Sequence, residues 1–185
     1  MKATREQKNQ AIQQLKRSFD KESHASALVS GILRTCNNEE ELASMVGKAK
    51  SVVESVRARG VSSFFAAEYG KLFQDPQTAM ATRERLMAIF EINHSLPPKR
   101  AAKMADCIVF TCAKKGGPEY IERFALLSAK ALRAVVPFEV LADVVYYSAA
   151  DIDPAAFAKR CVATSLKKNK PLVVSEVELA ARLNN

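Results

Sequence analysis

The most apolar helix-length window of the chain, Ala101 to Ala113, is the feature that most constrains how this sequence can fold. Only Lys103, Asp106 and Thr111 interrupt its run of apolar residues. Two prolines precede the window and a Lys-Lys-Gly-Gly-Pro segment follows it, which predicts a helix with a basic last turn and a glycine cap. A helix that is apolar on nearly all sides, yet too short to cross a bilayer, is typical of the centre of an all-helical domain.

Prolines divide the second half of the chain into helix-sized segments. Pro76, Pro98, Pro118, Pro137 and Pro154 recur at intervals of about 20 residues, and proline is favoured at the first position of a helix. We therefore expect an all-α, single-domain helical bundle of about eight to nine helices. HEAT-like antiparallel helix pairs, with a period of about 40 residues, are the alternative arrangement, although no residue pattern repeats from one pair to the next.

The N-terminal segment predicts a helix with a narrow apolar stripe. Ile12, Leu15 and Phe19 follow helical spacing over residues 2–22 in a polar, glutamine-rich and basic background. We divide the chain into a basic N-terminal helical arm, residues 1–22, and a single all-helical domain, residues 23–185. Docking of the arm by its stripe is the favoured interpretation, and a contact of Ile12, Leu15 and Phe19 with a protein partner is the alternative.

Capping signals place three further helix starts. Ser23 is a candidate cap for a second helix. Asn38 with Glu41 forms a capping-box pattern that opens a third helix ending at Gly60, and Ser175 with Glu178 opens the last helix.

No pattern in the sequence predicts catalysis, a cofactor or a metal site. The two histidines and four cysteines fit no zinc spacing, and neither a phosphate-binding glycine loop nor a nucleophile elbow occurs. We interpret all four cysteines as small buried residues of a reducing compartment. No secretory signal or transmembrane segment is apparent, so we expect a cytoplasmic protein that is not an enzyme and does not bind a membrane.

The net charge of +8 is concentrated in parts of the chain. Residues 1–36 hold seven basic and three acidic side chains, and residues 97–137 hold eight and three. The run 159–170 holds five basic residues and no acid. Such basic segments favour acidic partners, above all nucleic acid.

The first turn after the proline pair concentrates cations where a helix presents unpaired N–H groups. Lys99, Arg100 and Lys103 oppose the helix dipole there, and together with those N–H groups they predict an anion site. An exposed basic turn without a ligand is the slightly favoured alternative. The full set of candidate nucleic-acid-binding residues is Lys99, Arg100, Lys103, Lys114, Lys115, Arg123, Lys130, Arg133, Lys159, Arg160, Lys167, Lys168 and Lys170.

These patterns predict a non-enzymatic protein that binds nucleic acid through the phosphate backbone, as a candidate subunit of a ribonucleoprotein. RNA or single-stranded DNA is favoured over duplex, because no major-groove recognition helix is apparent. Tyr120 could also stack on a base, since it lies beside a basic row formed by Arg123, Lys130 and Arg133 at helical spacing. The alternative is a protein-interaction adaptor or assembly subunit whose basic face meets an acidic partner.

Overall fold

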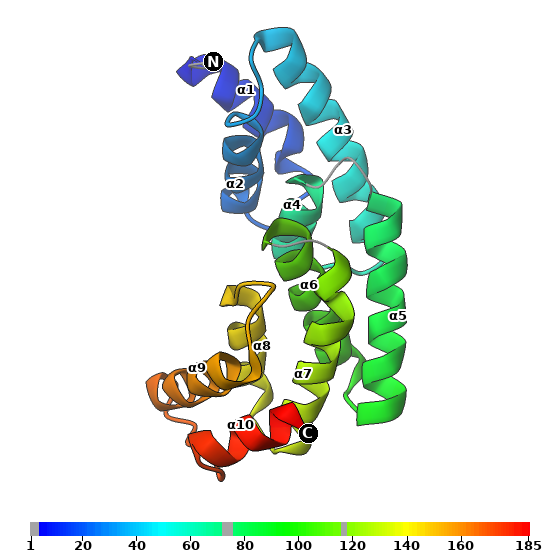
Figure 1. Cartoon of the computed structure of the whole chain (residues 1–185). Coiled ribbons are helices and arrows are strands. Elements are labelled where there is room, and N and C mark those ends of the chain that lie inside the picture. The colour runs from blue at the N-terminus through cyan, green and yellow to red at the C-terminus, as the bar shows by residue number, and fades with distance from the viewer. Residues whose placement is uncertain (1–3, 72–75, 116–117) are drawn as a thin grey trace. The chain divides into compact units, whose positions relative to one another are not determined.

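The computed structural model describes residues 4–71, 76–115 and 118–185, and the regular secondary structure of this part of the chain is all helical, without a strand (Figure 1). The predicted all-α class is therefore confirmed. The described residues form ten α-helices and one 3-10 turn, so the expected eight to nine helices were too few. Contacts group the chain into two compact units, Met1–Met80 and Ala81–Asn185. Each is described by itself.

Unit 1 packs four helices against one another. They are α1 (Arg5–Lys16), α2 (Glu22–Ile32), α3 (Glu39–Ala58) and α4 (Ser63–Lys71). Helix α1 contacts α2 and α3, and α4 contacts the same two helices. The single helix expected over residues 2–22 is wrong, because α1 ends at Lys16 and a turn containing the half-buried Phe19 precedes α2. Ile12 and Leu15 are buried within unit 1, so these two residues of the stripe are covered by the helices around them.

Local capping chemistry fixes the bounds of α3 but not those of α2. The Asn38 side chain accepts a hydrogen bond from the Glu41 amide at 2.8 Å. At the other end Gly60 takes a φ of 78° and Val61 N–H bonds back to Val56, as a glycine cap requires. The predicted cap Ser23 is wrong by two positions: α2 begins at Glu22, after a Lys21 that makes no side-chain cap.

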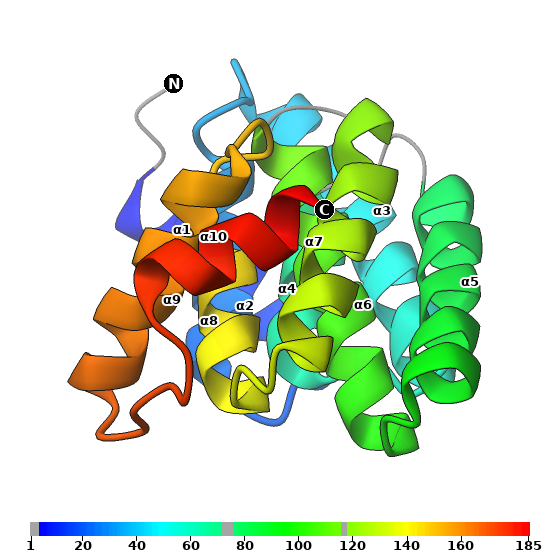
Figure 2. The same ribbon diagram turned by 60° about the horizontal axis from the view of Figure 1, so that its bottom comes forward.

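Helix α5 (Pro76–His94) crosses the boundary between the units, and the remaining elements belong to unit 2. They are α6 (Pro98–Lys115), η1 (Pro118–Tyr120), α7 (Ile121–Arg133), α8 (Phe138–Tyr147), α9 (Pro154–Lys167) and α10 (Glu176–Asn184). Figure 2 shows α10, in red, lying across α7 and α9, both of which it contacts. A contact that skips two helices favours a compact bundle for this unit, because a solenoid repeat touches only its neighbours.

Helix α6 is the buried helix of unit 2, as its apolar sequence predicts. Its residues from Met104 to Cys112 are all buried. The two polar ones among them are satisfied: Asp106 accepts from Arg83 at 2.6 Å, and the Thr111 hydroxyl donates to the Val145 carbonyl at 2.9 Å. Buried polar groups need such partners, so the interruptions of the apolar run are accommodated by specific bonds.

The proline pattern locates helix starts with two exceptions. Helices α5, α6 and α9 begin on their prolines, and Asp153 caps α9 by accepting from the Ala156 amide. Pro118 opens the 3-10 turn η1 instead of an α-helix, and Pro137 occupies the N-cap of α8, one residue before the helix. Within the described ranges, no helix is long and apolar enough to cross a membrane.

Candidate functional site

All of the predicted nucleic-acid-binding residues belong to unit 2. The side chains of Lys114 and Lys115 lie outside the described residues. The other eleven are exposed to solvent with one exception, the half-buried Lys130. Exposure alone does not make a site, so the partners of each cation decide what it can bind.

The first turn of α6 keeps fewer anion-binding groups than its sequence predicts. Pro98 has no N–H, and the amides of Arg100 and Ala101 donate to the Pro97 carbonyl at 2.8 and 3.0 Å. The Arg100 guanidinium is turned to Glu139, 3.3 Å from its Oε1, and lies 5.3 Å from the ring centre of Phe138. Lys99 and Lys103 remain exposed and one turn apart. Of the three cations predicted to form an anion site here, only Lys99 and Lys103 therefore remain available to bind an anion.

Acidic residues on one face of α8 hold cations from two distant segments. Lys170 donates to Glu139 at 3.0 Å, so Arg100 and Lys170 share this carboxylate. The hydrogen bond from Lys170, with a backbone hydrogen bond and the nearby charges, lowers the pKa of Glu139 below its ordinary value. One turn further along, Asp143 pairs with Lys168 at 2.6 Å. The basic run 159–170 is thus held against α8 by two ion pairs.

A groove of about 350 Å³ continues this face toward the end of α8. It runs between α8 and α9 and is lined by Asp143, Val144, Tyr147, Arg160, Ala163, Thr164, Lys167 and Lys168. Three of these residues are cations, and the single carboxylate is the one already paired with Lys168. Neither Arg160 nor Lys167 forms a salt bridge with an acid in the described ranges. The groove therefore presents an excess of positive charge.

Tyr147 is the aromatic residue of this groove, and sequence reasoning missed it. Its side chain is 67% exposed, whereas Tyr120, the stacking candidate chosen from the sequence, is half-buried at the end of η1. Tyr147 packs edge to face with Tyr146, 4.8 Å between ring centres, and Tyr146 stacks on Phe110 at 5.0 Å. The only sequence signal was the position of Tyr147 four residues after Asp143, on the same helical face.

The basic row predicted along α7 divides by role. Lys130 donates from its Nζ to the Leu183 carbonyl at 3.0 Å. A cation at this position is favourable because the C-terminal end of a helix, here α10, carries unpaired carbonyls and partial negative charge. Lys130 is therefore occupied in holding α10, while Arg123 and Arg133 stay exposed on α7 and do not line the groove.

The thiols of the chain are buried, as the sequence analysis predicts. Cys36, Cys107, Cys112 and Cys161 are all free and buried. Burial raises the pKa of Cys107, Cys112 and Cys161 to about 12, so these three stay protonated at neutral pH and are poor nucleophiles. Among the described residues no group of three or more His, Cys, Asp or Glu side chains is placed to hold a metal ion.

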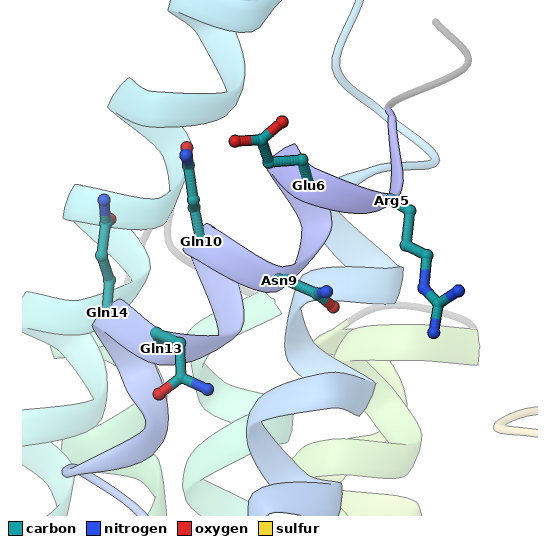
Figure 3. A pocket seen from close by; sticks show the side chains of 6 residues that line it. All are labelled: Arg5, Glu6, Asn9, Gln10, Gln13 and Gln14. Atoms are coloured by element: carbon teal, nitrogen blue, oxygen red, sulfur yellow. The ribbon is translucent and has the colours of Figure 1, made fainter.

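A larger hollow, of about 680 Å³, lies on α1 but lacks converging groups. It is lined by Arg5, Glu6, Asn9, Gln10, Gln13 and Gln14, all from this one helix. Figure 3 shows these side chains pointing away from the helix in different directions. One arginine balances one glutamate, and the other four residues are neutral amides. This hollow is the polar face of a docked helix, and it has neither the charge nor the two walls of the α8–α9 groove.

The chain matches no family model, no curated protein and no solved structure. The residues that line the α8–α9 groove and the positive charge of that groove are therefore the basis for the function.

Proposed function

We propose that this protein binds nucleic acid through the α8–α9 groove and the basic residues around it, without catalysing a reaction. The observation that carries the proposal is the groove itself, in which Arg160 and Lys167 pair with no acid among the described residues and line the same groove as the exposed Tyr147. Cations without a carboxylate partner can neutralise phosphates, and each one that does so releases condensed counterions.

The surrounding cations extend this surface beyond the groove. Lys168 lines the groove and pairs with Asp143, Lys170 beyond it pairs with Glu139, and Lys159 is exposed on α9. Contacts of this kind track a phosphate backbone without reading base edges. RNA or single-stranded DNA is the favoured ligand, and a ribonucleoprotein is the assembly in which we would expect such a subunit.

A cytoplasmic location is part of the proposal. It is supported by the four free, buried thiols, because disulfide bonds are rare in reducing compartments and cysteine is there used as a small apolar residue.

The proposal is tested by fluorescence anisotropy of labelled single-stranded RNA, single-stranded DNA and duplex DNA, titrated with the full chain at about 50 and about 200 mM salt. Binding that weakens by orders of magnitude between the two salt concentrations is the expected result. Absence of binding to all three probes at the lower salt concentration would refute the proposal.

A protein-interaction adaptor is the second candidate, and exposed apolar side chains favour it. Val173, just before α10, is 80% exposed, and Val177, four residues later in the first turn of α10, is 81% exposed. Apolar groups left to solvent in this way are candidates for contact with a partner. On this hypothesis a V173D/V177D variant should lose a protein complex that the wild-type chain forms, and its affinity for nucleic acid should not change.

A further inference from the structure

We infer that Tyr147 is a stacking platform for one unpaired base, and that Arg160 and Lys167 bind the phosphates beside that base. This inference rests on the proposed nucleic-acid binding and specifies its ligand: a single strand whose base can leave its own stack. It assigns a recognition role to a residue that neither charge nor sequence motif indicates.

The ring of Tyr147 is held in place from one side while most of its surface faces solvent. Its contact with Tyr146 is edge to face, with an angle of 87° between the ring planes, and Tyr146 is itself stacked on the buried Phe110. An edge-to-face contact leaves at least one face of the Tyr147 ring uncovered by Tyr146. A ring already ordered by its neighbours loses little conformational entropy when a base stacks on it.

Arg160 is held at the backbone of Tyr147 before any ligand arrives. Its Nη1 donates to the Tyr147 carbonyl at 2.9 Å, where the end of α8 carries partial negative charge. A guanidinium has five N–H donors, so this bond leaves others available for a phosphate. The contact fixes the cation at the main chain of the residue that carries the ring, without neutralising it.

Lys167 supplies a second cation on the same side of α9. It follows Arg160 by seven residues, which is close to two helical turns and about 10 Å along the helix axis, and both residues line the groove. Lys168 lies next to it, but its ammonium group is bound to Asp143. Arg160 and Lys167 are therefore the two groove cations available to separate phosphates.

The combination selects an unpaired nucleotide. Bases within a duplex are already stacked on both faces, and exposing one costs a few kcal/mol in unstacking and unpairing. An unpaired base in a single strand can stack on the tyrosine ring without this cost. The groove, at about 350 Å³, is near the lower end of the usual range for small-ligand pockets, roughly 300–1,000 Å³. That size suits one nucleotide better than a double helix.

The test compares a uridine oligomer of about ten nucleotides with an abasic oligomer of the same length, which keeps the phosphates and lacks the bases. We expect Tyr147→Ala to weaken binding of the uridine oligomer about tenfold, since stacking on an aromatic side chain contributes about that much or more per base. Tyr147→Phe should bind as wild type because it keeps the ring. Both variants should bind the abasic oligomer as wild type does.

Arg160→Gln/Lys167→Gln should weaken binding of both oligomers, because both carry the phosphates. The matched control is Arg34→Gln/Lys48→Gln, which removes one exposed arginine and one exposed lysine from unit 1 and should leave the affinity close to wild type. Circular dichroism and thermal melting confirm that each variant is folded.

The possible failures separate the two proposals. If wild type binds the oligomers but Tyr147→Ala binds the uridine oligomer equally well, or if duplex binds as tightly as single strand, the stacking inference is wrong and backbone binding stands. If wild type binds no nucleic acid, the proposed function and this inference both fall.

Discussion

Two kinds of cation within unit 2 differ in what surrounds them, and the difference separates structural charge from charge available to a ligand. Arg83 and Asp106 are each only 4% exposed and form an ion pair of 2.6 Å between α5 and α6. Arg160 and Lys167, by contrast, face an open groove and have no carboxylate partner among the described residues. In the sequence all three cations add equally to the net charge, but only the groove pair can bind a phosphate without breaking an existing contact.

Intermediate cases show that this distinction is graded. Lys130 is half-buried, and its ammonium group donates to a carbonyl at the end of α10. Arg100 and Lys170 both pair with the same carboxylate, Glu139, at the surface. A local excess of positive charge in the sequence therefore overstates the number of cations that a ligand can use.

Replacing Arg83 with Met should destabilise unit 2 by about 3–5 kcal/mol, because the Asp106 carboxylate would stay buried without its partner. Chemical denaturation monitored by circular dichroism measures the change. The double variant Arg83→Met/Asp106→Leu should recover most of the lost stability, since no unpaired charge remains. If the free energy of unfolding of Arg83→Met lies within about 1 kcal/mol of the wild-type value, the pair is accessible to solvent and contributes as little as a surface pair.

Replacing Arg160 and Lys167 together with Gln should lower the affinity for single-stranded RNA by about tenfold or more, because the loss of even one hydrogen bond to a charged group costs about 1.5–3 kcal/mol. The melting temperature should change little, since neither residue forms a salt bridge with a described acid. Anisotropy titration and a thermal melt provide the two readings. Loss of affinity equal to that of Arg34→Gln/Lys48→Gln would mean that the groove is no better than any other basic surface.

Replacing Lys99, Arg100 and Lys103 together with Gln should weaken nucleic-acid binding less than the groove variant does. Only Lys99 and Lys103 lack a carboxylate partner within the described part of the chain, because Arg100 is paired with Glu139. Thermal stability should change little, since removing cations from the first turn of a helix relieves an unfavourable interaction with its dipole, which offsets the loss of the half-exposed Arg100–Glu139 pair. A larger loss of affinity here than in the groove variant would make the start of α6 the principal site.

Replacing Glu139 with Gln should give the smallest effects, and it should tighten binding. The substitution releases Arg100 and Lys170 from a competing carboxylate, so affinity should rise by a few-fold at low salt. Weaker binding by this variant would show that Glu139 supports ligand binding instead of competing with the ligand for Arg100 and Lys170.

The same variant tests the ion pairs of Glu139 through pH. Lys170 lowers the pKa of this carboxyl in the folded protein, so the pairs stabilise the fold above the ordinary value of 4.5 and lose that contribution as the pH falls through the lowered pKa. The contribution should be below about 1 kcal/mol, because both pairs are half-exposed. Glu139→Gln should therefore be slightly less stable than wild type near pH 7, with a difference that disappears in acid.

Helix bounds were predictable where a cap acts within a few residues. Asn38, Asp153 and Ser175 each accept a hydrogen bond from the amide three positions on, and such local bonds can be read directly from the sequence. The turn after Lys16 and the shifted start of α2 were missed, because both depend on how unit 1 packs.

The site was less predictable than the fold. The run 159–170 was identified by its charge, but Tyr147 joins it only because α8 packs beside α9. The pairing of Arg100 with Glu139 likewise spans 39 residues of sequence. Contacts of this range follow from tertiary packing and leave no periodic signal in the chain.

The salt dependence of binding tests the central claim most directly. Affinity for single-stranded RNA is measured from about 50 to about 200 mM salt for wild type, the groove variant Arg160→Gln/Lys167→Gln and the control Arg34→Gln/Lys48→Gln. Two lost phosphate contacts should reduce the slope of log affinity against log salt by about 1.4 in the groove variant, with the control keeping the wild-type slope. Equal slopes for all three proteins would contradict the assignment of phosphate binding to the α8–α9 groove.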